Sequence, residues 1–292
     1  MQESCPICQS KTLVHAFHVK DHFLSQEEFD LFRCKTCDVI VTLPVPEPDK
    51  LESYYESREY FSHGGNKKGL VPASYNFIKG INIKKKYLQS TKGLELGEVL
   101  DIGCGIGDFL AYSKTKGWKV SGLEPNKHAR QIVKQQHKIE VEDVSQISKL
   151  PDESFSLVTL FHVLEHVIDP LEMIREIHRI LKPEGRLVIA LPNNESWDAK
   201  FYKEVWAGWD VPRHLFHFNP RSISNLMSRF PFQSELNKPM IWDAYYVSLL
   251  SEKYKKKSFP IVRAAFMGFI SNCKAKRKEN YSSVMYFYKK PV

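Results

Sequence analysis

The stretch Glu98–Tyr112, which reads EVLDIGCGIGDFLAY, decides the fold class of this 292-residue chain. Its first part, Val99–Ile102, contains the short apolar run of a buried strand. Glycines follow at positions 103, 105 and 107, and the residues from Asp108 onward read as a helix. A strand, a glycine turn and a helix in this order open a nucleotide-binding α/β unit, because glycine lets a ligand approach the backbone closely.

The residues around the turn indicate which nucleotide it suits. The dinucleotide fingerprint G-x-G-x-x-G would require glycine at position 108, where this chain has Asp108. Asp101, just before the turn, would repel a diphosphate but attract a cationic ligand. S-adenosylmethionine (SAM) carries an ammonium and a sulfonium and no phosphate. The sequence therefore favours SAM over a dinucleotide.

Two further strands end in acidic residues. The second strand ends at Glu124, 23 residues after Asp101, and an acid there is placed to accept hydrogen bonds from both ribose hydroxyls. A third strand, near residues 139–141, precedes Asp143. We expect Asp143 to accept a hydrogen bond from the adenine amino group. The alternative is that Asp143 is a solvated acid in a loop.

Strands and helices continue to alternate after the third strand. Ser156–Phe161 is nearly all apolar, as expected of a central parallel strand covered on both faces. Asp169 is predicted to cap the next helix, and Arg186–Leu191 is predicted to form the strand after it. This order predicts an α/β fold, a Rossmann-like, doubly wound and mostly parallel sheet.

Three motifs of this region occur in order: residues 101–108 (DIGCGIGD), 122–125 (GLEP) and 161–166 (FHVLEH). On these motifs, residues 95–192 resemble the class I SAM-dependent methyltransferases. The resemblance implies that the first motif surrounds the methionine part of SAM and that the second holds the ribose. It also implies that the late strand at residues 282–289 is the antiparallel closing strand of the sheet.

The expected cofactor contacts combine this match, which implies roles for Asp101, Gly103, Gly105 and Glu124, with the positions of other residues at the strand ends. They are Asp101, Gly103, Cys104, Gly105, Glu124, Pro125, Asp143 and His162. Glu165 and His166 are similar to a metal-assisted pattern of some quinol O-methyltransferases. Those enzymes have an acid at the position of His162, so a catalytic metal is not favoured here.

Four of the six cysteines form two C-x-x-C pairs. Cys5/Cys8 and Cys34/Cys37 are separated by 25 residues, and two such pairs can supply four thiolates to a tetrahedral Zn²⁺. Unrelated pairs or a redox dithiol are the alternatives, but the cytoplasmic location that we expect favours metal over disulfides. Four thiolates leave no open coordination position, which predicts a structural zinc.

The domain organisation follows from these motifs. We predict a zinc-ribbon-like module at residues 1–48, whose folding free energy the metal would supply. Residues 49–94 are predicted to form a linker with an aromatic flap, including Tyr55 and Tyr60, and a helix. Residues 95–292 are predicted to be the methyltransferase domain. The combination is similar in architecture to some sugar-modifying C-methyltransferases.

An acceptor-side insertion is expected at about residues 193–220, after the fifth strand. It is rich in aromatic side chains, histidine and arginine. Trp206 and Trp209 are candidates to stack on an acceptor, with Tyr55 and Tyr60 from the flap, and Arg213 is a candidate to clamp an acidic group. His214, and less so His217, are candidate general bases. The alternatives are packed histidines and tryptophans that anchor the insertion.

The net charge of +8 is concentrated near the C-terminus. Residues 252–290 carry eleven Lys or Arg against two acids, a net charge of +9, which leaves −1 elsewhere. A nucleic-acid footprint over the whole surface is therefore not favoured, while a local patch for lipid, glycan or RNA stays open. Phe259–Ile270 is apolar and flanked by basic residues, which leaves open a peripheral membrane contact. No transmembrane segment or secretory signal is predicted, and the oligomeric state is not readable.

We expect the chain to be an enzyme that methylates O or C of a small or glycan-like metabolite with SAM. One alternative is an RNA or protein methyltransferase that uses the zinc module and the basic segment to hold a polymer. A second alternative is a non-catalytic zinc-dependent scaffold, against which Asp101, the intact glycine turn and Glu124 argue.

Overall fold

Two β-sheets organise the chain, and the computed structural model describes residues 4–55, 70–277 and 279–292. The strands are β1 (Leu13–Lys20), β2 (Glu28–Cys34), β3 (Ile40–Leu43), β4 (Glu98–Ile102), β5 (Lys119–Leu123), β6 (Val141–Glu142), β7 (Phe155–Phe161), β8 (Leu181–Pro192), β9 (Phe216–His217), β10 (Gln233–Ser234), β11 (Lys238–Pro239) and β12 (Ser283–Lys289). The helices are α1 (Pro48–Ser53), α3 (Leu70–Ser90), α4 (Asp108–Thr115), α5 (Lys127–His137), α6 (Pro170–Ile180), α7 (Trp197–Tyr202), α8 (Pro220–Met227), α9 (Asp243–Tyr254) and α10 (Pro260–Ala275). The short 3-10 helices are η1 (Val144–Lys149), η2 (Leu164–His166), η3 (Lys203–Val205) and η4 (Ala207–Trp209).

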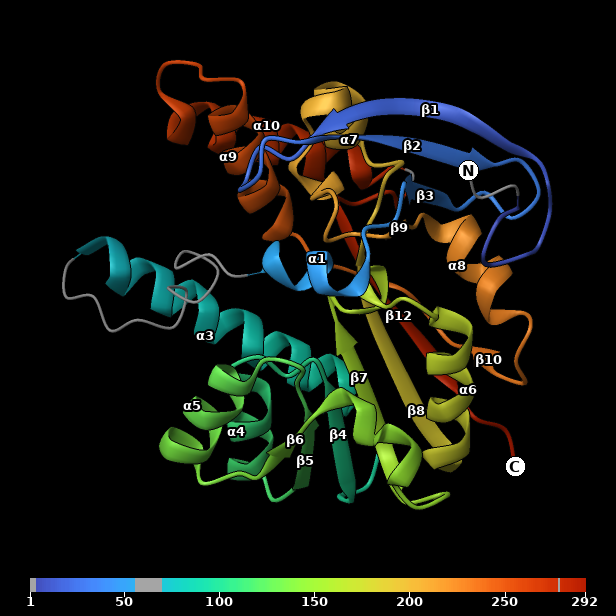
Figure 1. The fold of residues 1–292 in the computed structure, drawn as a ribbon. Coiled ribbons are helices and arrows are strands. Elements are labelled where there is room, and N and C mark those ends of the chain that lie inside the picture. Colours follow the sequence, from blue (N-terminus) through green and yellow to red (C-terminus); the bar gives the residue numbers. More distant parts are fainter. Residues whose placement is uncertain (1–3, 56–69, 278) are drawn as a thin grey trace.

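The larger sheet has the strand order β10-β12-β8-β7-β4-β5-β6, and β11 also pairs with β12. Strands β8, β7, β4, β5 and β6 are parallel, and β12 is antiparallel to β8. Helices α3, α4 and α5 lie on one side of this sheet and α6 on the other (Figure 1). The predicted mostly parallel α/β fold with an antiparallel closing strand is confirmed.

Local sequence explains the central elements. Val99, Leu100 and Ile102 of β4 are fully buried, because neighbouring strands and helices cover both faces of a central parallel strand. Asp169 accepts a hydrogen bond from the backbone N–H of Glu172 at 3.0 Å, which caps α6 as predicted. Because these strands are parallel, their carboxyl ends lie at the same end of the sheet, where ligands bind in such folds.

The smaller sheet has the order β1-β2-β3-β9 and joins two distant parts of the chain. Ile40 and Val41 of β3 pair antiparallel with His217 and Phe216 of β9. The cysteine-rich N-terminal segment and the segment after β8 thus share one sheet. It lies beyond the carboxyl ends of the parallel strands (Figure 1).

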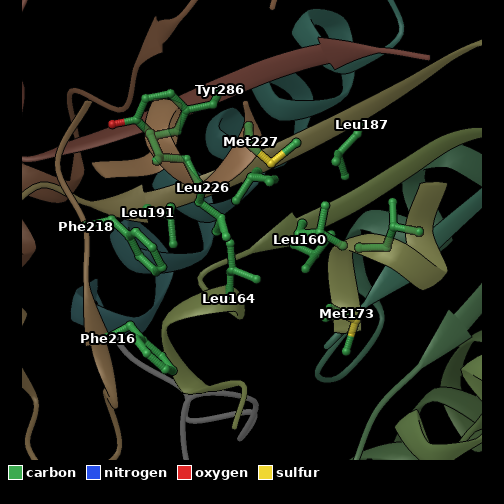
Figure 2. Packing of buried hydrophobic residues seen from close by; sticks show 14 of the residues in the cluster. Leu160, Leu164, Met173, Leu187, Leu191, Phe216, Phe218, Leu226, Met227 and Tyr286 are labelled. Atoms are coloured by element: carbon green, nitrogen blue, oxygen red, sulfur yellow. The ribbon is translucent and has the colours of Figure 1, made fainter. Parts of the chain in front are cut away.

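One continuous apolar core holds the segment after β8 against the larger sheet. Figure 2 shows Phe216 and Phe218 beside Leu164 and Leu191, which come from η2 and β8. The same cluster includes Cys5 and other buried residues of the N-terminal segment. The two sheets are therefore packed together rather than connected by a linker alone. None of the described helices is long and apolar enough to cross a bilayer.

Candidate active site

The glycine turn between β4 and α4 adopts backbone angles that favour glycine. The φ values of Gly103, Gly105 and Gly107 are 66°, 54° and 79°. A Cβ on Gly103 would lie 2.4 Å from Cγ2 of Val163, so this glycine is needed for packing. A Cβ on Gly105 would meet nothing within 4 Å. Open space next to the Gly105 backbone is what close approach of a ligand requires.

Asp101 lies in β4, one residue before its end, and is almost fully buried, with 3% of its surface exposed. Its Oδ1 accepts a hydrogen bond from the Thr159 hydroxyl at 2.6 Å. Burial raises the pKa of Asp101 to about 7, against the effect of this bond. The charged form of Asp101 is unfavourable in this buried position, and a cationic ligand would stabilise it. This agrees with the electrostatic preference for SAM inferred from the sequence.

Glu124 directly after β5 is buried and tied to the glycine turn. Its Oε2 accepts a hydrogen bond from the Gly105 N–H at 2.8 Å, and its Oε1 accepts one from the Asn126 N–H at 2.9 Å. Burial raises the pKa of Glu124, although both bonds favour the charged form. Each oxygen keeps a further lone pair, so the carboxylate can still accept ribose hydroxyls.

Arg130 of α5 connects three of the other predicted cofactor positions. Its Nη1 donates to the carbonyls of Glu124 and Pro125 and, at 2.8 Å, to Oδ2 of Asp143. Asp143 also caps η1 and has 41% of its side chain exposed, so it remains accessible. Cys104 faces Gly122, and burial raises the pKa of its thiol, so it is not a thiolate nucleophile.

His162 follows β7 with a positive φ of 60° and lies between two carboxylates. Its Nε2 is 3.1 Å from Oδ2 of Asp243, and its Nδ1 is 3.5 Å from Oε1 of Glu165. Burial disfavours the imidazolium, but these two contacts outweigh it and raise the pKa of His162 to about 9. His162 is therefore a cation at neutral pH. Asp243, at the start of α9, had no signal in the sequence.

Lys86 of α3 is a second group that sequence reasoning missed. The Lys86 side chain is half-buried, and its Nζ is 4.4 Å from the centroid of the Phe161 ring. Burial lowers its pKa, while the charges of Asp243 and Asp101 oppose that shift. Helix α3 thus brings an amino group to the end of the sheet where the acidic residues lie.

A second polar cluster lies next to this end of the sheet. Glu165, His166 and His214 each offer one ligand atom, and these atoms lie within 4.8 Å of one another. Glu165 is 1% exposed, and its Oε1 lies 3.5 Å from Nδ1 of His162. A buried carboxylate is costly unless it is paired, and His162 supplies part of that compensation.

The hydrogen bonds of the two histidines assign a proton to each Nδ1, and His214 Nε2 lies 3.9 Å from Oδ2 of Asp210. His214 Nδ1 lies 3.0 Å from the Gly208 carbonyl, and His166 Nδ1 lies 3.0 Å from the Arg213 carbonyl. A carbonyl only accepts, so each Nδ1 carries a proton, and in the neutral form of each ring the lone pair is on Nε2. Burial, and next the nearby His214, lower the pKa of His166 to about 4. Such a set can accept a proton or hold a divalent ion.

Of the other predicted acceptor residues, Tyr55 contacts this cluster, whereas the two tryptophans are buried within the insertion. The Tyr55 hydroxyl is 3.0 Å from His166 Nδ1, so Tyr55 belongs to this cluster. Trp206 and Trp209 are buried, and their indole N–H groups donate to Asp198 and to the Lys203 carbonyl. Their rings anchor the insertion, which was the alternative to an acceptor wall. Tyr60 lies outside the described residues.

Arg213 and His217 are also engaged within the protein. Arg213 is 1% exposed, and its Nη2 lies 2.9 Å from Asp21 and 2.7 Å from Asp210. Its charge is already compensated, which does not support a clamp on an acidic acceptor. His217 Nε2 is 2.9 Å from the Thr42 hydroxyl, and burial lowers its pKa well below 6.5. This histidine joins β9 to β3.

The four predicted zinc ligands come together at the start of the smaller sheet. The Sγ atoms of Cys5 and Cys37 are 3.6 Å apart, those of Cys8 and Cys34 are 3.5 Å apart, and all four lie within 4.8 Å. Tetrahedral Zn–S bonds of about 2.3 Å imply sulfur separations of about 3.8 Å. The cluster is compatible with zinc.

Comparisons with known proteins agree with this geometry. Residues 79–235 match a protein family described as a methyltransferase domain. The ubiquinone biosynthesis O-methyltransferase of Pseudomonas aeruginosa (strain LESB58) is 32% identical over 120 residues, covering 38% of this chain and 51% of that protein. The protein of the same name from Histophilus somni (strain 2336) is 34% identical over 168 residues, covering 52% of this chain and 67% of that protein.

A solved structure shares the fold at low identity. The geranyl diphosphate C-methyltransferase from Streptomyces coelicolor A3(2) gives a TM-score of 0.53 at 14% identity, covering 84% of this chain and 86% of that one. The chain spans about half the length of several of the curated relatives it matches. The family match covers more than half of the chain and includes the glycine turn and both acidic strand ends. The protein belongs to the methyltransferase-domain family.

Proposed function

We propose that this protein is a SAM-dependent methyltransferase whose acceptor is a hydroxyl of a small or glycan-like metabolite. One observation carries the proposal: a buried carboxyl group, Asp101, beside a glycine turn whose Gly105 faces open space. The names of the relatives, which are O-methyltransferases, support oxygen as the acceptor atom. Methylation at carbon is the alternative, as in the similar solved structure.

Each residue of the SAM site has a defined task in this proposal. SAM supplies an electrophilic methyl group on a sulfonium. Asp101 attracts the positive charge of its amino-acid part, and Glu124 accepts the ribose hydroxyls. Asp143 is proposed to contact the adenine, and Gly103, Cys104, Gly105 and Pro125 provide the adjacent backbone. His162 and Asp243 close the pocket on the side of β7.

His214 is the proposed general base. Because its Nδ1–H is held by the Gly208 carbonyl, its Nε2 is left to accept the proton of an acceptor hydroxyl. The buried carboxylate of Glu165 then stabilises the imidazolium that forms. Tyr55, beside His166, is proposed to contact the acceptor. Alternatively, Glu165, His166 and His214 could hold a divalent ion. In that case a chelator would abolish the activity.

Cys5, Cys8, Cys34 and Cys37 are proposed to hold a structural zinc. Four thiolates close the coordination sphere, so the metal would take no part in methyl transfer. It would instead fix β2 and β3, and β3 pairs with β9, which follows His214 closely in the chain. The zinc is thereby linked to the position of the proposed base.

Calorimetric titration of SAM into wild type and Asp101→Asn tests the site. Asp152→Asn is the matched control, because Asp152 is 74% exposed and precedes β7 at the opposite end of the sheet. We expect SAM binding by wild type and the control, and a loss of at least about 30-fold in Asp101→Asn. Unchanged affinity in that variant would contradict the assignment. A screen of hydroxylated acceptors with labelled SAM, followed by mass spectrometry, then identifies the product.

A further inference from the structure

Helix α10 and the residue before it expose an unusual set of large apolar side chains. The exposed fractions are 78% for Phe259, 73% for Ile261, 68% for Val262, 60% for Phe266 and 59% for Phe269. The last three are spaced i, i+4 and i+7, so they lie on one face of the helix. We call these five residues the α10 patch. Large apolar side chains exposed together on one helix are typical of an interaction site.

The opposite face of α10 is fixed against the protein by small residues. Ala264, Gly268, Ser271 and Ala275 are buried. A Cβ on Gly268 would lie 2.6 Å from Cδ1 of Tyr245, and the Ser271 hydroxyl donates to Asp198 at 2.6 Å. The orientation of the helix is therefore determined by close packing and by a buried hydrogen bond. The α10 patch faces outward for that reason and cannot be buried by a small rotation.

Basic residues flank the patch at both ends of the helix. They are exposed and have no acidic partner within ion-pair distance among the described parts of the chain: Lys253, Lys256, Lys257, Lys274, Lys276 and Arg277. The buried acid nearby, Glu252, is already paired with Arg263 through a 2.6 Å contact. The positive charge around the patch is thus uncompensated, and it suits an anionic surface.

The patch is connected to the active site through α9. Asp243 at the start of α9 contacts His162, and α10 packs along α9. Figure 1 shows both helices beyond the carboxyl ends of the parallel strands, the end at which the candidate active site lies. A surface that holds the patch would therefore lie at the same end of the larger sheet as the candidate active site.

We propose that α10 and the Lys253–Phe259 segment form an interfacial element that docks on an anionic lipid surface. Apolar side chains in the acyl boundary and lysines at the headgroups are the pattern of such helices. In this arrangement α10 lies along the lipid surface, with its small-residue face still packed on the protein. A second copy of the chain fits less well, because face-to-face docking would bring two sets of like charges together.

The test is flotation of the purified full-length protein with vesicles. We expect at least about tenfold stronger binding to 70:30 phosphatidylcholine:phosphatidylglycerol than to pure phosphatidylcholine, weakened by about 0.5 M salt. The double variant Phe266→Ser/Phe269→Ser and the charge variant Lys256→Glu/Lys257→Glu should each lose at least about tenfold in binding. Leu96→Ser, at a 64% exposed leucine away from α10, should bind as wild type does.

Thermal unfolding and SAM calorimetry show that each variant is folded. Because SAM binding does not involve α10, failure of vesicle binding with intact SAM binding overturns this proposal alone. Equal binding to both vesicle types, or full binding by the Phe266/Phe269 variant, also overturns it. A dimer by light scattering that is lost in that variant, with no vesicle binding by wild type, assigns the patch to a second copy instead.

Discussion

The cost of burying Asp101 leads to a quantitative prediction about stability. Its pKa is about 7 in the folded protein, against 3.8 for an ordinary aspartate. A raised folded-state pKa means that the fold favours the protonated form. The resulting stability is fully present below pH 3.8 and is lost as the pH rises through about 7. A shift of about 3 units corresponds to at most about 4 kcal/mol.

Asp101→Asn replaces the carboxyl with a neutral group of the same shape. The Asn Oδ1 can still accept the hydrogen bond from Thr159, so packing is preserved. Without SAM, we expect the variant to exceed wild type in free energy of unfolding by about 2 kcal/mol at about pH 5 and by about 4 kcal/mol at about pH 8. The same variant should lose SAM affinity, since the attraction for the cation is removed.

Urea unfolding followed by circular dichroism, in steps from about pH 5 to about pH 8, measures this difference. Comparing variant with wild type at each pH cancels the titration of groups that do not interact with Asp101. A difference that is independent of pH would refute the reasoning about Asp101, as would a variant that is less stable than wild type at the upper end of this range. Asp152→Asn is again the control and should show no such trend.

Three further predictions concern other parts of the molecule. Metal analysis of the wild type should find one equivalent of zinc, and Cys34→Ser should lack it and unfold at a lower temperature; a metal-free wild type after gentle purification would contradict a zinc site. Asp21→Ala should destabilise the protein by about 3–5 kcal/mol in urea unfolding, because it leaves the buried Arg213 with one fewer carboxylate; a change under about 1 kcal/mol would show that the pair is not structural. His214→Gln should lower kcat about 10²–10⁴-fold with unchanged SAM affinity, and near-normal turnover would remove His214 from the mechanism. Loss of wild-type turnover with a chelator, restored by a divalent ion, would instead favour a metal at Glu165 and its neighbours.

Short-range sequence patterns were sufficient to predict the larger sheet. The glycine turn, the strand-end acids and the capped helix at Asp169 are each encoded within a few neighbouring residues. Their positions at one sheet edge then follow from parallel topology, so the sequence alone could place Asp101 and Glu124 there. The cysteine pairs are equally local, because each C-x-x-C brings its own two sulfurs close together.

The remaining features depend on pairings between distant residues. His162 meets Asp243, Arg213 meets Asp21, and β3 pairs with β9, and no short-range pattern encodes these contacts. The tryptophans of the insertion illustrate a second limit. An aromatic residue with a polar tip suits an acceptor wall or a buried anchor equally well, and only the partner of the indole N–H decides between them.

The central claim is that the acid-led glycine turn binds a cationic sulfur nucleoside and not a diphosphate. Calorimetric titration of wild-type protein near pH 8 with SAM and, separately, with NAD tests it most directly. The account predicts one saturable SAM site and no detectable heat with NAD. Preferential binding of NAD, or no binding of SAM by protein that is folded, would contradict it.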